Sequence, residues 1–384
     1  MRFEFATATR ILFGPGTLRE VAPLAKNMGR RALVVTGQNV GRAETFLAQL
    51  SAAGVGHTTF AVATEPTTPL VESGAKLARA ESCDVVISIG GGSVIDAGKA
   101  VAALTTNQGD LLDYLEVIGK GKPLESAPLP LIAIPTTAGT GAEVTRNAVL
   151  ASPEHRVKAS LRSPLLLPKL AVVDPELTLG LPPALTASTG MDALTQLIEP
   201  FVSCRANAFT DSLCRDGIPR VARSLRRACE QPDDLAARED MALASLFSGL
   251  ALANAGLGAV HGFAAPIGGM FAAPHGAVCA ALLPHVMEVN VRALRQRQPR
   301  NISLTRFDEV ARLLTGKADA TADRGVTWVR ELCADLKIPA LGRFGITPAD
   351  VPSLCEKAAQ ASSMKGNPLP LMTEELLKIL SGSL

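Results

Sequence analysis

The sequence predicts a doubly wound α/β domain at the N-terminus, followed by an all-α domain. Over the first half of the chain, short and nearly continuous apolar runs alternate with amphipathic stretches. This alternation is typical of a parallel sheet covered by helices on both faces. After Asp174-Pro175 the alternation stops, and the remaining chain has helical periodicity with few β-branched runs. We therefore expect two domains, residues 1–182 and 183–384.

Five apolar runs rich in β-branched residues are the expected strands of the first domain: 32–36, 58–62, 84–89, 130–134 and 170–173. Four stretches with helical periodicity accompany them: 18–28, 45–53, 70–80 and 93–104. Two further runs, 148–151 and 156–159, flank Ser152-Pro-Glu-His155 and predict a β-hairpin. The connector Leu179-Gly-Leu-Pro-Pro183 is rich in helix-breaking residues and marks the expected boundary.

Composition narrows the class of protein. The 384 residues are 47% hydrophobic and 19% charged, which is typical of a globular chain long enough for two domains. The formal net charge of +2 gives no electrostatic surface for nucleic acid, so we expect no nucleic-acid partner. Seven cysteines, an odd number without C-x-x-C spacing, favour reduced thiols. With no signal peptide at the N-terminus, these thiols predict a cytoplasmic protein.

Residues 241–287 contain no Lys, Arg, Asp or Glu. Part of this stretch has the length of a membrane span, but it also contains three histidines, Asn254 and many glycines. It lacks an aromatic belt and flanking Lys or Arg residues. We therefore expect buried helices of a helical domain and no membrane partner.

The first motif with chemical potential is Ser88-Ile-Gly-Gly-Gly-Ser-Val-Ile-Asp96. An expected strand runs into three glycines, and Ser93 is expected to begin a helix with Asp96 as its capping-box partner. Glycine allows close backbone approach, and free N–H groups at a helix start attract anions. Ile95 stands where G-x-G-x-x-G would have its third glycine. The motif alone fits a pyrophosphate site or a plain strand–helix turn.

A second motif, Ile134-Pro-Thr-Thr-Ala-Gly-Thr-Gly-Ala-Glu143, follows the end of another expected strand. Thr136, Thr137 and Thr140 offer donors to phosphate or ribose oxygens at the strand's carboxyl end, where open α/β sheets place ligands. A helix N-cap is the alternative interpretation. The two motifs together favour a dinucleotide site.

The helical half holds a candidate metal site. Asp192 and Gln196 lie four residues apart in a helical pattern and share one face. His261 and His275 lie in the uncharged stretch, where such groups are costly unless paired or coordinated. One carboxylate and two imidazoles leave open metal positions, as catalytic sites do. A hydrogen-bonded core histidine is the alternative for each one singly. Four further residues fit either a substrate pocket or the protein core: Phe201, Phe247, Asn254 and Phe263.

These motifs, taken in order, resemble the iron-containing (group III) alcohol dehydrogenase family over essentially the whole chain. The resemblance is carried by Gly90-Gly-Gly-Ser93 with Asp96 and Lys99, Pro135 to Thr145, Asp174-Pro175, Gly190-Met-Asp-Ala-Leu-Thr195, His261-Gly and Pro274-His-Gly276. It implies a dehydroquinate synthase-like architecture, with a dinucleotide-binding domain, a helical metal- and substrate-binding domain, and the active site in the cleft between them. It also implies a homodimer or larger homo-oligomer.

The resemblance implies reversible hydride transfer between NAD or NADP and a small alcohol or aldehyde. A divalent metal, iron or zinc, would act as a Lewis acid. The matching metal positions are Asp192, His261 and His275, with Gln196 as a possible fourth. The matching cofactor positions are Gly37, Gly90, Gly91, Gly92, Ser93, Asp96, Thr136, Thr137, Thr140, Lys158 and Leu177.

The chain departs from the family pattern at three positions. Gln196 replaces the family's first metal-binding histidine, and an amide oxygen is a poorer donor than imidazole for iron or zinc. Ala265 replaces a frequent histidine beside the nicotinamide. Gly37 stands where many such domains have an acid that repels a 2′-phosphate, so the sequence allows NADP(H) as well as NAD(H).

Three other functions compete with a metal-assisted alcohol dehydrogenase. A metal-free reductase similar to maleylacetate reductases is favoured by Gln196 and disfavoured by the retained Asp192, His261 and His275. A lyase resembling dehydroquinate synthase would need a Lys/Arg cluster, which residues 241–287 do not supply. A non-catalytic binding protein is disfavoured by the two retained cofactor motifs.

Overall fold

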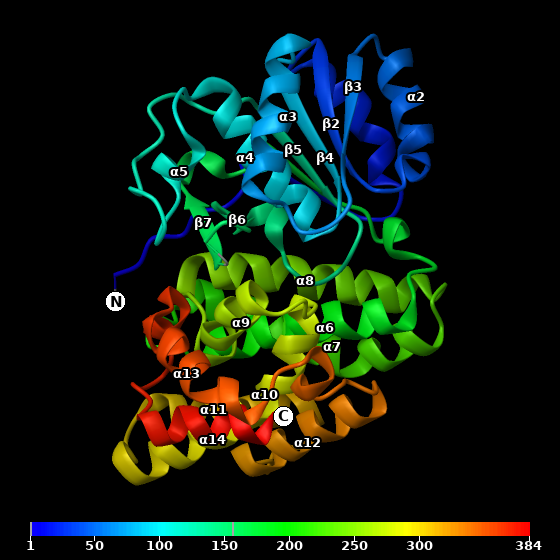
Figure 1. Ribbon diagram of the computed structural model, residues 1–384. Helices are drawn as coiled ribbons and strands as arrows, with labels where there is room; N and C mark the ends of the chain where they lie inside the picture. The colour runs from blue at the N-terminus through cyan, green and yellow to red at the C-terminus, as the bar shows by residue number, and fades with distance from the viewer. Residues whose placement is uncertain (1, 156) are drawn as a thin grey trace. The chain divides into compact units, whose positions relative to one another are not determined.

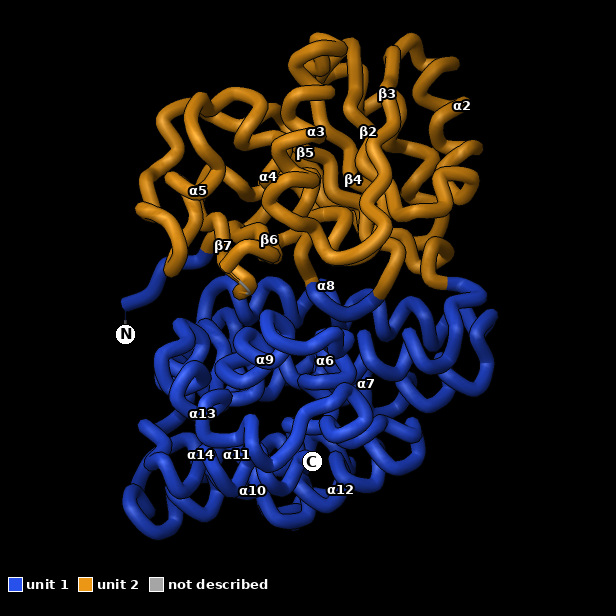
Figure 2. The backbone as a smooth tube through the Cα atoms, viewed as in Figure 1, with its two compact units in different colours: residues 1–5, 138–140, 179–384 blue, residues 6–137, 141–178 orange. Residues whose placement is uncertain are grey.

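The computed structural model describes residues 2–155 and 157–384 (Figure 1). Two compact units are formed (Figure 2). The α/β unit comprises residues 6–137 and 141–178, and the helical unit comprises residues 179–384, Ala138–Thr140 and the described residues before Ala6. The chain passes to the helical unit after residue 178, close to the expected boundary near 182. Within the helical unit, Gly180 N–H donates to Pro232 O (3.2 Å) and Leu181 O accepts from the Arg238 guanidinium (3.3 Å).

The α/β unit is built on a six-stranded sheet whose paired strands all run parallel, in the order β1-β8-β5-β4-β2-β3. The strands are β1 (Ile11–Phe13), β2 (Arg31–Gly37), β3 (Gly56–Val62), β4 (Val85–Gly90), β5 (Leu131–Pro135) and β8 (Leu170–Val173). The five predicted strands are confirmed. The edge strand β1 was not predicted, because three apolar residues before a Gly-Pro-Gly turn carry too little pattern.

Strands β6 (Asn147–Ser152) and β7 (Val157–Arg162) form a separate antiparallel pair, with Asn147 opposite Arg162. This confirms the predicted hairpin. Arg156, which the prediction placed at the start of its second strand, lies outside the described residues.

Helices cover both faces of the large sheet, as expected for a doubly wound domain. Alternate residues of β2 point to opposite faces: Leu33 and Val35 belong to one buried cluster, and Ala32 and Val34 to another. The first cluster includes residues of α3 (Thr68–Ala80) and α4 (Gly92–Thr106), and the second residues of α1 (Val21–Lys26) and α2 (Glu44–Ala52). The remaining helical segments are α5 (Leu111–Tyr114), η1 (Thr17–Glu20), η2 (Val40–Ala43), η3 (Ala142–Val144), η4 (Pro164–Leu166) and η5 (Pro175–Thr178).

The helical unit packs its helices around one apolar core. Its helices are α6 (Pro183–Val202), α7 (Ala208–Glu230), α8 (Leu235–Ala255), α9 (Ala259–Met270), α10 (His275–Arg297), α11 (Ile302–Thr315), α12 (Ala322–Asp335), α13 (Val351–Gln360) and α14 (Thr373–Gly382). Short turns of 3₁₀ helix lie at η6 (Leu341–Phe344), η7 (Pro348–Asp350) and η8 (Ser362–Gly366).

The uncharged stretch forms the end of α8, all of α9 and the first half of α10, as predicted for buried helices. Among the described residues, α10 alone is long and apolar enough to cross a membrane by itself, and 78% of its most apolar window is buried in the protein. Helices α8 and α9 would qualify only as a pair, and they are bent by 98°. The apolar surface of α10 is therefore mostly used in core packing.

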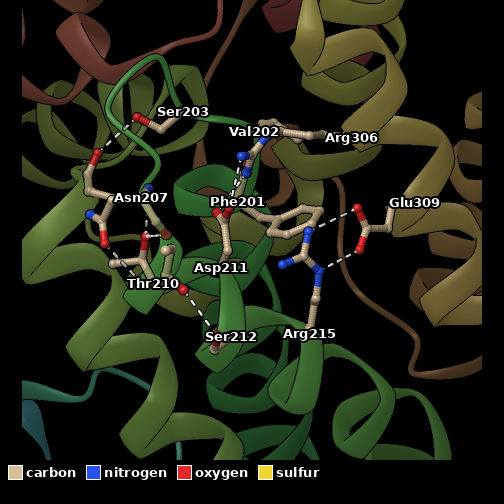
Figure 3. A network of polar contacts seen from close by, with 12 residues as sticks. Phe201, Val202, Ser203, Asn207, Thr210, Asp211, Ser212, Arg215, Arg306 and Glu309 are labelled. Carbon is tan, nitrogen blue, oxygen red and sulfur yellow. Dashed lines mark hydrogen bonds and ion pairs between the residues drawn. The ribbon is translucent and has the colours of Figure 1, made fainter. Parts of the chain in front are cut away.

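A polar network at the end of α6 fixes the packing of α7 and α11 (Figure 3). The Phe201 ring is fully buried, with the Arg215 and Arg306 guanidinium groups 5.3 and 5.1 Å from its centroid. Arg306 also binds both carboxylate oxygens of Asp211, at 2.6 and 2.8 Å. Phe201 is therefore a core residue and not the pocket residue that the sequence left as an alternative.

Candidate metal centre and dinucleotide site

Three helices of the helical unit bring the predicted metal-site residues together. The Asp192 Oδ1 atom on α6 lies 3.4 Å from His261 Nε2 on α9 and 3.7 Å from His275 Nε2 on α10. The Cys279 Sγ atom completes the group, 3.8 Å from His261 Nε2 and 3.6 Å from His275 Nε2. One ligand atom from each of these four residues lies within 4.8 Å of every other. We call these four residues the α6–α10 cluster.

Glycines allow the helices to approach closely enough to form this cluster. A Cβ at Gly276 would lie 2.3 Å from the carbonyl oxygen of Ser188, so the first turn of α10 packs directly on α6. On another side of α6, a Cβ at Gly190 would lie 2.3 Å from a methyl group of Leu225 on α7, which carries none of the four residues. Pro274 precedes α10 as its N-cap and makes His275 the first helical residue, as the sequence predicted.

A buried carboxylate orients His261. Glu199 accepts a hydrogen bond from His261 Nδ1 at 2.7 Å with one oxygen and from the Val260 N–H at 2.7 Å with the other. Because Nδ1 holds the proton facing Glu199, the Nε2 lone pair of the neutral ring points towards Asp192. Carboxylate–histidine pairs of this kind support metal ligands in many proteins.

The electrostatics of the cluster are strongly coupled. Burial opposes the charged form of Asp192, but neighbouring His275 and His261 outweigh it and hold the pKa of this carboxyl below its usual range. For His261 burial also opposes charge, yet Cys279, Asp192 and Glu199 raise its pKa well above the usual value. The pKa of His275 is raised, first by Cys279.

The cluster has the features of a metal site. Asp192 is buried, and its Oδ1 has no hydrogen-bond partner within the described residues although it faces two imidazoles. A buried polar atom without a partner is costly, and a bound cation would satisfy it. The side chain of His275 is 38% exposed, so ligands can reach the cluster on this side. The residues present therefore fit a divalent metal ion.

Gln196, one turn after Asp192 on α6, is engaged elsewhere. Its amide Nε2 donates a hydrogen bond to the carbonyl oxygen of Gly139 at 2.9 Å. Ser248 Oγ lies 3.4 Å from the same oxygen. Gly139 belongs to the segment Ala138–Thr140, which is part of the helical unit. Gln196 therefore ties this segment to α6.

In the α/β unit, the two predicted cofactor loops leave neighbouring strands. Gly90 at the end of β4 pairs with Pro135 at the end of β5, and the Thr136 N–H donates to Gly90 O at 2.9 Å. A Cβ at Gly91 would lie 3.5 Å from Thr137 Oγ1, an ordinary contact distance. The side chain of Thr137 therefore borders the glycine turn.

At the start of α4, the Val94 and Ile95 N–H groups donate to the carbonyl oxygen of Gly91 at 3.0 and 3.1 Å, which leaves the N–H groups before them to face a ligand. The predicted capping box is wrong: the helix begins at Gly92, and its N-cap, Gly91, gives no side-chain hydrogen bond within the described chain. Asp96 instead accepts from the Val149 N–H at 3.0 Å. The first N–H groups of a helix have no intrahelical partners. The turn of Gly91, Gly92 and Ser93 thus offers a ready anion site.

The topology points to the same edge of the sheet. Strand β3 follows β2 in the chain and lies on one side of it in the sheet. Strands β5 and β8 follow β4 and lie on the opposite side of β4. The direction in which the chain adds strands therefore reverses between β2 and β4. Open α/β sheets bind ligands outside the carboxyl ends of the strands at such a point. Gly37 ends β2 there, and a Cβ at Gly37 would meet no atom within 4 Å.

Three further residues predicted to bind the cofactor, Thr140, Lys158 and Leu177, have different neighbours from the glycine turn. Thr140 belongs to the helical unit. Lys158 Nζ on β7 pairs with a Glu65 carboxylate oxygen at 2.5 Å. Leu177 in η5 packs on the core cluster that contains Val34.

Two residues of the cluster's environment were missed from the sequence, Cys279 and Glu199. Both follow a helical repeat from a residue that was found: Cys279 lies four residues after His275, and Glu199 seven after Asp192. A search for ligand types at these spacings would have found both.

Comparisons with known proteins agree with this architecture. Residues 8–175 match the family described as "Iron-containing alcohol dehydrogenase", and residues 186–384 match "Fe-containing alcohol dehydrogenase family, C-terminal". The 1,3-propanediol dehydrogenase of Citrobacter freundii is 35% identical over 390 residues, which cover 98% of this chain and 97% of that protein.

Solved structures give the same result. A 1,3-propanediol oxidoreductase superimposes with a TM-score of 0.92 at 34% identity, over 100% of both chains. A sulfoacetaldehyde reductase from Bifidobacterium kashiwanohense, solved in complex with NAD+, gives a TM-score of 0.88 at 28% identity, over 100% of this chain and 99% of that one.

The fold and these matches define an NAD-linked oxidoreductase that acts on alcohols. The chain belongs to the iron-containing alcohol dehydrogenase family. It is accordingly an enzyme that uses NAD(H) and a metal, and the resemblance stated from the sequence is confirmed.

Proposed function

We propose that the protein catalyses reversible hydride transfer between NAD(H) and a short alcohol or its aldehyde, with one divalent metal ion held by Asp192, His261 and His275. The observation that carries this assignment is the buried, unpartnered Oδ1 of Asp192 facing both imidazole Nε2 atoms. When bound, the ion supplies a Lewis acid that lowers the pKa of the alcohol hydroxyl.

The protein's own groups have separate roles in this proposal. Glu199 keeps the His261 ring in the ligating tautomer through the 2.7 Å bond to Nδ1. The N–H groups at the start of α4 hold the cofactor pyrophosphate, and Thr136 and Thr137 donate to its oxygens. Ala265, an exposed residue on α9 one turn after His261, has no ionisable side chain, so the alcohol proton leaves through solvent or a substrate group.

We further propose that NADP(H) is usable. Gly37 presents no negative charge to a 2′-phosphate, and the space beside it is open. We expect catalytic efficiencies with the two cofactors to agree within about tenfold, a difference of about 1.4 kcal/mol. Gly37→Asp has room for its side chain and should select against NADP(H). Strict NAD dependence of the wild-type enzyme would contradict this part of the proposal.

The proposed cellular compartment and oligomeric state rest on the cysteines and on the family resemblance. All seven cysteines, which lie within the described chain, are free, which fits the reducing cytoplasm. We propose a homodimer or larger homo-oligomer on the resemblance, and light scattering measures the size directly.

The deciding experiment is a substrate screen, starting with 1,3-propanediol, the substrate in the names of two relatives. Short alcohols and aldehydes are assayed with NAD(H) and NADP(H), with and without chelator, beside elemental analysis. His275→Ala should lower metal content and activity together. Full activity of a rigorously metal-free protein would contradict the metal role and favour a metal-free reductase similar to maleylacetate reductases.

A further inference from the structure

We propose that Cys279 is a thiolate ligand of the metal, completing an Asp–His–His–Cys donor set in which sulfur replaces the nitrogen donor missing at Gln196. The inference rests on the proposed metal role of the α6–α10 cluster. It goes beyond that role by adding a ligand and changing the chemical class of the site.

The spacing of the four donor atoms matches a tetrahedron. With metal bonds of about 2.1 Å to N and O and about 2.3 Å to S, tetrahedral neighbours lie about 3.4 Å apart for an N/O pair and about 3.6 Å for an N/S pair. The N/O distances here are 3.4 and 3.7 Å, and the N/S distances are 3.6 and 3.8 Å. Two of the six edges thus have the required length, and two more are longer than it by 0.3 and 0.2 Å.

Helix geometry explains why this residue can take the fourth position. His275 and Cys279 lie one turn apart on α10, so their side chains share a face. Cys279 is fully buried, and its sulfur faces two imidazole nitrogens. A cysteine that served only as a small apolar core residue would not need such neighbours.

The position of Gln196 also supports Cys279 as the fourth ligand. The Gln196 amide donates one hydrogen bond, from Nε2 to the carbonyl oxygen of Gly139 at 2.9 Å, so this side chain already has a structural partner. A divalent ion in the cluster would otherwise have three protein donors. Thiolate is a good donor for zinc and cobalt, and its proton is released to solvent as the metal binds.

Cobalt gives a direct test, because a thiolate bound to Co²⁺ produces a near-ultraviolet charge-transfer band that imidazole and carboxylate donors do not. The full-length protein is stripped with chelator and titrated with Co²⁺. The wild type should show the band at one equivalent, and Cys279→Ser should lose it. Cys229→Ser is the matched control, since Cys229 is also buried in the helical unit but lies on α7.

Binding strength is the second readout. Loss of an outer-shell partner typically costs roughly 10–100-fold in metal affinity, so loss of a direct ligand should weaken Co²⁺ binding by at least roughly tenfold. Circular dichroism of Cys279→Ser and Cys279→Ala checks that both variants are folded. Gln196→His in the Cys279→Ser background should restore affinity without restoring the band.

The outcomes separate this inference from the proposed function. If the wild type binds Co²⁺, and His275→Ala abolishes binding, but no thiolate band forms and Cys279→Ser binds as tightly, then Cys279 is not a ligand and the three-donor site stands. If the wild type binds neither Co²⁺ nor Zn²⁺, the metal role itself is wrong and the inference fails with it.

Discussion

Replacing Glu199 by Gln should turn His261 from a metal ligand into a hydrogen-bond donor. The wild-type carboxylate accepts two bonds of 2.7 Å, from the Val260 N–H and from His261 Nδ1. An amide has one accepting oxygen. If that oxygen keeps the fixed backbone N–H, the amide NH₂ group faces Nδ1, which must then accept. The ring proton moves to Nε2, the atom that faces Asp192 at 3.4 Å.

The expected effect is large enough to measure. Loss of a carboxylate behind a ligating histidine weakens metal binding by roughly 10–100-fold, which is about 1.4–2.8 kcal/mol. The opposite amide orientation does not escape the cost, because it sets the NH₂ group against the Val260 N–H. A buried donor left unsatisfied costs about 1–3 kcal/mol.

Competition with a chromophoric chelator measures the metal affinity, and nitrogen-detected NMR at a pH where the ring is neutral reports the His261 tautomer. Glu309→Gln is the control, since Glu309 pairs with Arg215 at 2.6 Å in the same unit and has no contact with the cluster among the described residues. Metal affinity within about twofold of the wild type, together with a retained Nδ1–H, would refute the role given to Glu199.

Three further changes test other parts of the structure. Gly91→Ala should preserve the melting temperature, because its Cβ meets only the Thr137 side chain, 3.5 Å from Oγ1 and 3.7 Å from Cγ2, but it should weaken NAD(H) binding in a fluorescence titration; unchanged affinity would mean that the pyrophosphate binds elsewhere. Gly276→Ala should destabilise the protein by about 1–3 kcal/mol and lower metal content, because its Cβ would approach Ser188 O to 2.3 Å; Gly56→Ala, which has room, is the control. Burial raises the pKa of Glu143 from 4.5 to about 7, so the folded carboxyl keeps its proton to a higher pH than the unfolded one, and this contribution to stability is lost as the pH rises between these values. The melting temperature of Glu143→Gln, relative to that of the wild type, should therefore be higher at pH 8 than at pH 5. An equal difference in melting temperature at both pH values would count against a buried, uncharged Glu143 at low pH.

Sequence patterns predicted the parts of this protein that depend on local repetition. The run Leu170–Val173 was placed to the residue, because four apolar residues between polar turns leave few alternatives. The glycine turn after β4 was recognised, yet the N-cap was placed two residues late, at Ser93 in place of Gly91, since serine is a better N-cap by type than glycine. Asp96 met a backbone partner, Val149, that lies 53 residues away in sequence, and no local pattern reveals such a contact.

In the α6–α10 cluster, too, contacts between distant parts of the chain were harder to predict than local patterns. Asp192, His261 and His275 were grouped because ionisable residues are rare in an apolar stretch. Cys279 was missed because cysteine is among the residues most often buried for packing alone, although its spacing of four residues places it on the same helical face as His275. The crossing of α6, α9 and α10 places its sulfur beside the second imidazole, that of His261, as well. The position of a donor in space, rather than its type, decided the assignment.

The two unusual residues of the site, Gln196 and Cys279, have a common electrostatic consequence. In the proposed Asp–His–His–Cys set the donors carry two negative charges, one more than one Asp and three His would carry. The Glu199 carboxylate, which accepts from His261 Nδ1 at 2.7 Å, adds a third negative charge beside them. Asp192 and Cys279 are 2% and 0% exposed, and charges at such depth are expensive to bury unless a cation is bound. The proposed exchange of imidazole for thiolate should therefore strengthen retention of the ion, while the added negative charge makes the ion a weaker electrophile towards the alcohol oxygen.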